Sequence, residues 1–186
     1  MSSSTSALQQ KNAKHLIQSF SDLSYIKNPE STHIISRADG VYIYDNDGKK
    51  ILDSMSGLWC VNMGYGQQSI IEAVNDQMKE LVYYNNFFGS SHPSAIKLSE
   101  MIADKTPEGM NQVYFCGSGS EANDTVVRLA RHYWAARGNP SKSVIISRTT
   151  AYHGSTMAGA SLGGMSAMHA QGGLPIADIE HIDQPY

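Results

Sequence analysis

The stretch from residue 112 to residue 147 constrains the fold of this chain more than any other part. Residues 112–116 are a candidate for a buried strand, residues 121–137 carry apolar side chains along one helical face, and residues 144–147 predict a second apolar strand. Gly138-Asn139-Pro140 is expected to end the helix. A strand, a helix and a strand of these lengths form a βαβ unit, so the sequence predicts a parallel sheet with a right-handed crossover.

The N-terminal part has a different texture, and we place a domain boundary after it, at residue 62. Residues 1–10 are polar and predict a mobile tail, and residues 11–20 have a weak helical pattern. From His33 onward, short strands alternate with turns, and Asn46-Asp47-Gly48 supplies one tight turn. We therefore expect residues 1–62 to form a tail, a helix and a small antiparallel unit.

Residues 63–186 are expected to form the first, incomplete part of a larger domain. Their first long helix carries one apolar stripe, formed by Ile70, Val74, Met78 and Leu81. Pro93 opens a second helix, because proline is favoured at the first helical position.

Composition excludes several classes of function. The 186 residues are 41% hydrophobic and 17% charged, with a formal net charge of −3, so nothing favours nucleic acid or an anionic membrane surface as a partner. No stretch approaches the roughly 18 apolar residues of a membrane span, and the polar start lacks a secretory signal. The two cysteines form no CxxC pair and no trusted metal-ligand spacing occurs. We expect a cytoplasmic enzyme without a metal site.

The turn Gly117-Ser118-Gly119-Ser120 is the strongest candidate for a binding site. It lies between a predicted strand and a predicted helix, where the first N–H groups of the helix lack acceptors and favour an anion such as phosphate. Gly119 has no Cβ to keep the anion away. The alternative is that Ser120 only caps the helix. No lysine follows as in a Walker loop, and the GxGxxG dinucleotide pattern is incomplete.

Aromatic residues supply further candidates. Tyr152, in Ala151-Tyr152-His153-Gly154, follows the second strand, at the sheet edge where α/β proteins bind ligands, and its ring could stack on a flat cofactor. The alternative is one more partly buried tyrosine. Trp59 and the pair Phe87 and Phe88 either fill a core or wall a pocket, and the phenylalanines could also lie at an interface. We interpret His153 as structural.

Taken together, these motifs resemble the class III aminotransferases. The resemblance rests on Gly117-Ser118-Gly119-Ser120-Glu121-Ala122-Asn123-Asp124-Thr125 followed by Ala151-Tyr152-His153-Gly154. The segments 52–59 (LDSMSGLW) and 172–175 (GGLP) are similar to the branch that acts on ω-amino acids and amines with pyruvate. The similarity runs from about Phe20 to the end of the chain.

The resemblance implies an α/β protein of fold type I, dependent on pyridoxal phosphate (PLP). This chain would hold the N-terminal segment of the small domain and the first part of the large, mostly parallel-sheet domain. The family forms an obligate homodimer and transfers an amino group from an amine or amino-acid donor to a keto-acid acceptor. Gly119 and Ser120 match the groups that bind the PLP phosphate, and Tyr152 matches the ring stacked on the pyridine. Trp59, Phe20 and Phe87 match substrate-pocket aromatics, Phe87 usually reaching across the dimer.

The resemblance also implies that key residues lie outside this chain. In the family, the lysine that forms the Schiff base with PLP, the aspartate paired with the pyridine nitrogen and the arginine that binds the substrate carboxylate all follow later in the sequence. We therefore assign no catalytic residue, and we expect the 186 residues alone to be inactive and to aggregate through uncovered apolar faces. The alternatives are a related PLP mutase, racemase or decarboxylase, a nucleotide-binding protein, and a non-catalytic fragment.

Overall fold

The computed structural model describes residues 4–185, which form two compact units, Met1–His92 and Pro93–Tyr186. Both α-helices and β-strands are present, which confirms the predicted α/β class. The units are defined by contacts within this chain, whereas the boundary at residue 62 concerns the domains of a complete enzyme and stays a prediction.

The first unit begins with a helix where the sequence predicted a tail. Its helical elements up to the first strand are α1 (Thr5–His15), α2 (Leu23–Ile26) and a 3₁₀ turn, η1 (Pro29–Ser31). The side chains of Gln9 and Asn12 donate to Thr32, at 2.9 Å to its carbonyl oxygen and 3.1 Å to its hydroxyl. The expected tail over residues 1–10 is therefore wrong from residue 5 onward, because polar side chains attach α1 to the following turn.

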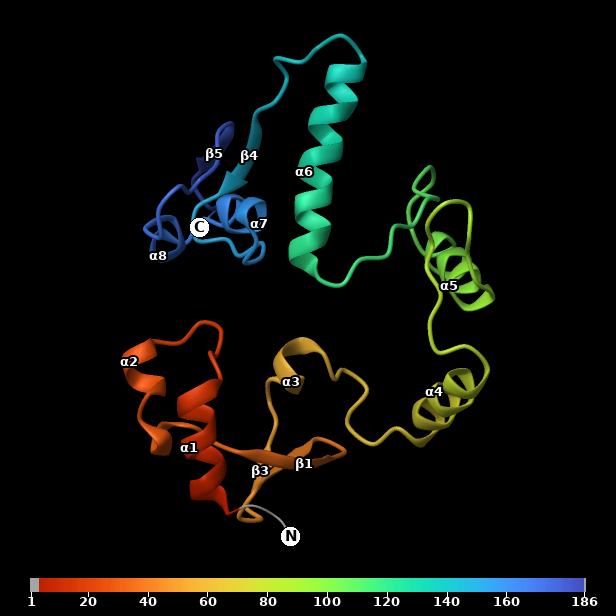
Figure 1. Ribbon diagram of the computed structural model, residues 1–186. Coiled ribbons are helices and arrows are strands. Elements are labelled where there is room, and N and C mark those ends of the chain that lie inside the picture. Colours follow the sequence, from red (N-terminus) through yellow and green to blue (C-terminus); the bar gives the residue numbers. More distant parts are fainter. Residues whose placement is uncertain (1–3, 186) are drawn as a thin grey trace. The chain divides into compact units, whose positions relative to one another are not determined.

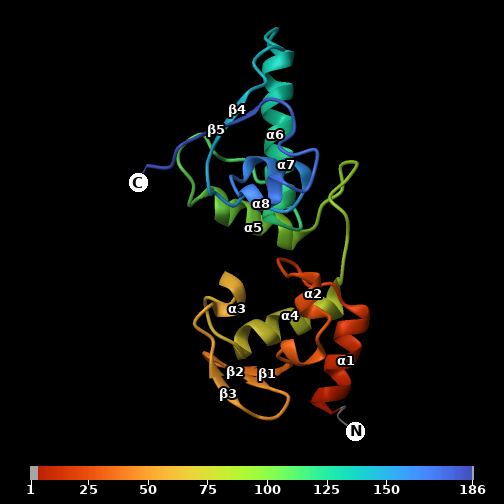
Figure 2. The same ribbon diagram turned by 90° about the vertical axis from the view of Figure 1, so that its left-hand side faces the viewer.

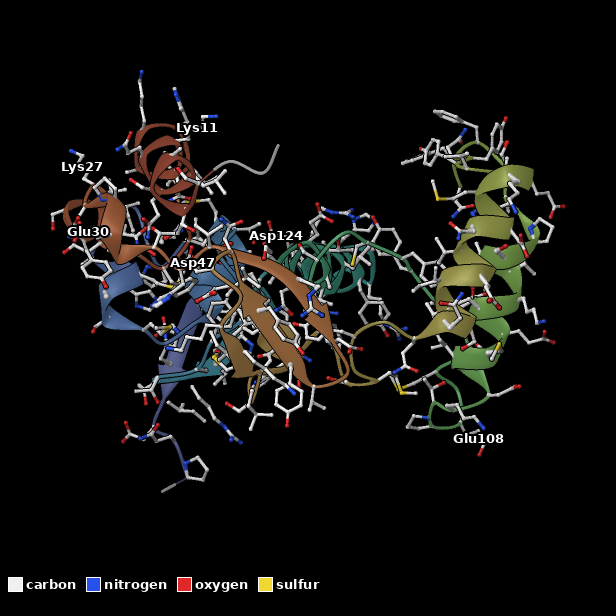
Figure 3. The ribbon with its side chains drawn as sticks, turned by 90° about the horizontal axis from the view of Figure 1, so that it is seen from below. Lys11, Lys27, Glu30, Asp47, Glu108 and Asp124 are labelled. Atoms are coloured by element: carbon white, nitrogen blue, oxygen red, sulfur yellow. The ribbon has the colours of Figure 1, made fainter. Side chains whose placement is uncertain are left out.

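A three-stranded antiparallel sheet follows, as the sequence predicted. Its strands are β1 (Ile35–Asp39), β2 (Tyr42–Asp45) and β3 (Lys50–Leu52), in the order β1-β2-β3. Asp47, labelled in Figure 3, lies in the turn between β2 and β3, where its carboxylate accepts a hydrogen bond from the Thr5 hydroxyl. The start of α1 is therefore attached to the predicted turn.

Two further helices complete the first unit. They are α3 (Ser56–Trp59), a single turn, and α4 (Gln68–Glu80). The predicted apolar stripe lies on α4 and its C-terminal cap, and its side chains are one-third to one-half exposed. The period that predicted the helix is confirmed, but within this chain the stripe is not buried.

The second unit contains a parallel strand pair beside helices (Figure 1). Its elements are α5 (Pro93–Ala103), α6 (Gly119–Ala136), β4 (Ile145–Arg148), α7 (Met157–Leu162), α8 (Ser166–His169) and β5 (Ile179–Ile182). β4 and β5 pair in parallel, with Ile145 opposite Ile179. Figures 1 and 2 show α7 beside the N-terminal half of α6.

The core of this unit is small and apolar. It consists of the buried side chains Val127, Ala158, Leu162 and Ile179, with Ile145 and Ile176 packed against them. Burial of these side chains from α6, α7 and β5 removes apolar surface from water and fixes α7 against α6. This packing determines where the loop before α7 meets the start of α6.

The predicted strand over residues 112–116 is absent from the part of the chain that the structure describes. The parallel partner of β4 is β5, one connection further along the chain. Tyr114 and Phe115 are exposed rather than buried. An apolar run indicates a tendency to be buried, but a strand also needs a neighbouring backbone, and residues 4–185 provide none beside this segment.

The described residues contain neither a membrane-spanning helix nor a cluster of metal ligands. None of the helices within residues 4–185 has both the length and the apolar character to cross a membrane. The same residues contain no group of three His, Cys, Asp or Glu side chains arranged to hold a metal ion.

Candidate functional site

The start of α6 is closed by a reciprocal pair of hydrogen bonds. The N-cap residue is Ser118, whose hydroxyl accepts from the N–H of Glu121 at 3.2 Å. The Glu121 carboxylate in turn accepts from the N–H of Gly117 at 2.6 Å. This arrangement is a variant of the capping box, and it assigns the cap to Ser118. The alternative in which Ser120 caps the helix is therefore wrong.

The next two backbone amides of α6 remain available to a ligand. Within residues 4–185, the N–H groups of Gly119 and Ser120 have no hydrogen-bond acceptor. They lie in the first helical turn, where the aligned peptide dipoles give the helix end a partial positive charge. Together they can donate two hydrogen bonds to one anion.

The protein atoms around residue 119 leave room for a side chain larger than that of glycine. A Cβ atom built on this residue would meet no protein atom within 4 Å, and its φ lies outside the left-handed region. Neither packing nor backbone conformation therefore explains a glycine here. The glycine leaves open space at the start of α6.

A second segment is held against the start of α6 by hydrogen bonds to its side chains. The Asn123 amide donates to the carbonyl oxygen of His153 at 2.6 Å, and the N–H of Ser155 donates to the Ser120 hydroxyl oxygen at 3.1 Å. Because Ser120 Oγ accepts this bond, its own hydroxyl hydrogen can still be donated to a ligand.

Gly154 permits this close approach. Its φ is +129°, and a Cβ atom here would lie 2.6 Å from Ser120 Oγ and 2.9 Å from Ser120 Cα. Both values are far below van der Waals contact. Any side chain at residue 154 would therefore force the loop away from α6.

Asp124 provides a further attachment one turn into α6, and it is labelled in Figure 3. Its Oδ1 accepts from the hydroxyl of Thr156 at 2.6 Å and from the N–H of Gly159 at 3.1 Å. Thr156 is itself the N-cap residue of α7. One carboxylate oxygen therefore joins the first part of α6 to the start of α7.

These contacts create a recess of ≈ 380 Å³ at the start of α6. Its lining brings together the three predicted cofactor-binding residues, Gly119, Ser120 and Tyr152, with four neighbours, Ser118, Asn123, His153 and Gly154. Tyr152 is 56% exposed, and its role in binding a cofactor stays a prediction beside the alternative of a partly buried tyrosine. Free amides, a hydroxyl and an aromatic ring thus line one hollow.

The three predicted substrate-binding aromatics lie in the other unit and on separate segments. Phe20 lies between α1 and α2, Trp59 ends α3, and Phe87 follows α4. Their exposed fractions are 66%, 85% and 66%. None of them is a core residue within this chain.

The backbone that carries Trp59 is strained. The four residues from Ser56 to Trp59 have φ values of 50°, 60°, 63° and 67°, so α3 is a left-handed turn. For residues other than glycine, the left-handed conformation costs about 1–2 kcal/mol each, and it is rarely adopted by successive residues. Such strain persists only where surrounding contacts hold it.

A carboxylate supplies those contacts. Asp53 Oδ2 accepts from the N–H of Gly57 and from the Tyr65 hydroxyl, both at 2.7 Å, and Oδ1 accepts from the N–H of Met55 at 3.2 Å. The Tyr65 hydroxyl and then the Gly57 amide hold the pKa of Asp53 below its ordinary value, because they stabilise the carboxylate. The same hydrogen bond to Asp53 raises the pKa of Tyr65.

Sequence reasoning missed four of these residues. Asp53, Asp124 and Gly154 belonged to motifs of the resemblance but were given no role, and Tyr65 was given none either. Aspartate before a serine- and glycine-rich segment is a signal for a carboxylate that bonds to the following backbone, and it could have identified Asp53. The contacts of Asp124 and Gly154 depend on tertiary structure and carry no comparable local signal.

Comparison with known proteins decides the family. The sequence profile described as aminotransferase class-III matches residues 25–186 of this chain. The chain belongs to the class III aminotransferases. Enzymes of this family use PLP, and an ω-transaminase from Pseudomonas jessenii was solved in complex with PMP. That structure is 35% identical in sequence, has a TM-score of 0.92, and is matched over 96% of this chain and 39% of its own.

Two other relatives of this class III aminotransferase chain are similar over nearly all of it. Putrescine–pyruvate aminotransferase from Pseudomonas aeruginosa is 55% identical over 172 residues, which is 92% of this chain and 38% of the relative. A thermostable (S)-enantioselective ω-transaminase from Thermomicrobium roseum has a TM-score of 0.94 at 31% identity, covering 100% of this chain and 41% of its own. The chain therefore spans about 40% of the length of these relatives. The predicted match to fold-type I aminotransferases is confirmed over that part.

The recess fits the phosphate end of PLP on geometric grounds. Two amides without acceptors point to an anion, and a Cβ atom at Gly119 would meet no protein atom within 4 Å, so the protein leaves this position open. The Tyr152 ring lines the same hollow.

Proposed function

We propose that the full-length protein transfers an amino group from an amine or ω-amino acid to a keto acid such as pyruvate, with PLP held in the recess at the start of α6. One observation carries this proposal: Gly119, Ser120 and Tyr152 line a single hollow. Membership of the class III aminotransferases supports the reaction type. The 55% identity to a putrescine–pyruvate aminotransferase supports an amine as donor and pyruvate as acceptor.

Each residue of the recess has a distinct part in the proposal. The N–H groups of Gly119 and Ser120 donate to the phosphate, and the Ser120 hydroxyl adds a third donor because its oxygen already accepts from Ser155. Tyr152 packs its ring against the flat face of the cofactor and so fixes the plane in which the substrate must bind. PLP, when bound, supplies the electron sink for breaking a bond at the amine-bearing carbon.

The remaining features of the active site are part of the same proposal. Trp59, Phe20 and Phe87 limit the substrate pocket, with Phe87 serving the second subunit of a homodimer. Residues beyond this chain supply the lysine that moves the proton, and the 186 residues alone are inactive. These residues correspond to the N-terminal segment of the small domain and the beginning of a large, mostly parallel-sheet domain in a cytoplasmic enzyme.

Substitution of Gly119 by alanine in the full-length protein tests the phosphate site. The new methyl group meets no protein atom within 4 Å, so the melting temperature of the apoprotein should not fall. The same methyl group occupies the space assigned to the phosphate. We expect the dissociation constant for PLP to rise by about tenfold to a hundredfold, the effect of losing one or two charge-assisted hydrogen bonds.

Pyridoxal, which lacks the phosphate, is the matched control ligand. Its affinity, measured by the same absorbance titration, should change by no more than about twofold, because it makes no contact with the helix amides. Unchanged PLP affinity in the Gly119→Ala protein, or an equal loss for PLP and pyridoxal, would show that the phosphate lies elsewhere.

A further inference from the structure

The left-handed turn of α3 has a feature that the phosphate recess does not explain. Three residues other than glycine, Ser56, Leu58 and Trp59, hold positive φ values in succession around Gly57. Within residues 4–185, packing of the indole does not offset the strain, since Trp59 is 85% exposed there. Because packing within this chain does not stabilise the unfavourable backbone, the turn is best explained by the position that it gives to Trp59.

The Asp53 carboxylate connects the turn to the residues that flank it. Asp53 precedes it and Tyr65 follows it, and Asp53 Oδ2 accepts from the Tyr65 hydroxyl and from the N–H of Gly57, inside the turn. A Cβ atom at Gly57 would lie 3.1 Å from the Tyr65 hydroxyl oxygen and 2.8 Å from a Val61 methyl carbon. The Tyr65 hydroxyl therefore packs directly against the strained backbone as well as bonding to Asp53.

Tyr65 connects this arrangement to the antiparallel sheet. Its N–H donates to the carbonyl oxygen of Gly40 at 2.7 Å and its carbonyl oxygen accepts from the N–H of Gly40 at 3.2 Å, in the connection between β1 and β2. At the other end, the N–H of Trp59 donates to the carbonyl oxygen of Met55 at 2.8 Å. A continuous series of hydrogen bonds, through Tyr65, Asp53 and Met55, thus runs from the sheet to the residue that carries the indole.

We infer that Asp53 and Tyr65 are positioning residues that set the orientation of Trp59 and thereby the size of amine that the enzyme accepts. This inference rests on the proposed function, because Trp59 is assigned to the substrate pocket there. Neither residue needs to touch the substrate. Loss of the Tyr65 hydroxyl or of the Asp53 carboxylate would release the turn toward ordinary backbone conformations and let the indole move.

The experiment compares Tyr65→Phe and Asp53→Asn in the full-length holoenzyme, using putrescine as a slender donor and 1-phenylethylamine as a bulky one. Removal of one hydrogen bond should change the ratio of the two KM values by about fivefold, while kcat with putrescine changes by less than about twofold. A purely structural defect would lower kcat and raise KM for both donors alike.

Matched controls come from the same unit. Asp45→Asn removes a carboxylate that likewise accepts from two backbone N–H groups, those of Asp47 at 3.0 Å and Lys49 at 2.8 Å, in the β2–β3 turn. Tyr44→Phe removes a hydroxyl from a ring that contacts the Arg37 guanidinium through its face. Both controls should leave the KM ratio at the value of the unsubstituted protein.

A second measurement reports on Trp59 without activity. In protein labelled with 5-fluorotryptophan, the ¹⁹F resonance that Trp59→Phe removes should shift in Tyr65→Phe and Asp53→Asn and stay in place in the two controls. An unmoved resonance overturns the inference, as does an equal fall in kcat and an equal rise in KM for both donors. If Trp59→Phe leaves the KM ratio unchanged, the pocket assignment of the proposed function fails, whereas the resonance still decides whether Asp53 and Tyr65 position the indole.

Discussion

The recess at the start of α6 and the turn of α3 present their side chains in different ways. The recess uses a regular helix, whose first amides lack acceptors by geometry, and needs only that a second segment come close. The α3 turn uses four residues with positive φ, and it needs a carboxylate that holds the backbone in place. The recess therefore depends on the lack of a Cβ atom at Gly119 and Gly154. The α3 turn depends instead on the hydrogen bonds of Asp53.

Because the two regions are built differently, they should tolerate different substitutions. In the recess, an added methyl group should do more damage than the loss of a polar group, because the spacing of two segments is critical. At α3, loss of a polar group should matter more. The following predictions test this contrast.

Gly154→Ala should have the largest effect. The new Cβ atom would lie 2.6 Å from Ser120 Oγ, and the φ of +129° is unfavourable for alanine. Steric crowding and backbone strain together should lower the free energy of unfolding by about 2–5 kcal/mol, measured by urea denaturation of the full-length apoprotein.

Gly138→Ala separates the two causes. Gly138 also has a positive φ, of +80°, but a Cβ atom there would meet nothing within 4 Å. It should therefore show the cost of strain alone, about 1–3 kcal/mol. Equal losses at the two glycines would mean that the close approach of the loop to α6 is unimportant.

Asp124→Ala should have an intermediate effect. It leaves the Gly159 N–H and the Thr156 hydroxyl without their shared acceptor, which should cost about 1–3 kcal/mol of unfolding free energy. Asp76→Ala is the control, since its ion pair with Lys79 is exposed and should contribute less than about 1 kcal/mol. If both alanine variants unfold at the same urea concentration, Asp124 does not join α6 to α7 in the way described.

The smallest effect concerns the pH dependence of the α3 turn. The pKa of Asp53 is lowered in the folded protein, so its hydrogen bonds stabilise the fold above the ordinary aspartate pKa of about 4 and lose this effect as the pH falls further. The difference in melting temperature between the unsubstituted protein and Asp53→Asn should be largest near neutral pH and shrink toward acid pH. If the difference in melting temperature stays constant with pH, the stabilisation by Asp53 does not depend on its charge.

Much of the regular structure could be predicted from the sequence, because local patterns determine it. The helical period gave α4 and α6, and the turn at residues 46–48 gave the hairpin between β2 and β3. The glycine- and serine-rich turn indicated Gly119 and Ser120, and the segment after β4 indicated Tyr152; all three line the recess. The role of these residues in binding PLP stays a prediction.

The failures share a dependence on neighbours. Residues 112–116 have the composition of a strand but no adjacent backbone within residues 4–185. The N-cap is Ser118 rather than Ser120, because the helix begins at Gly119, and the Ser120 hydroxyl instead accepts from Ser155, a residue far along the chain. The left-handed conformation of α3 has no signal beyond Gly57, because three of its four residues are types that normally avoid it.

The lining of the recess comes from two short segments, residues 118–123 and 152–154, which are separated by 28 residues. Closing a loop of this length costs little chain entropy, and contacts close in sequence form early in folding. The hollow should therefore assemble quickly, before any contact with distant parts of a longer chain is needed. The core that fixes α7 against α6 includes Ile176 and Ile179, so a block exchanged between homologous enzymes should extend through β5 to carry the phosphate-binding geometry with it.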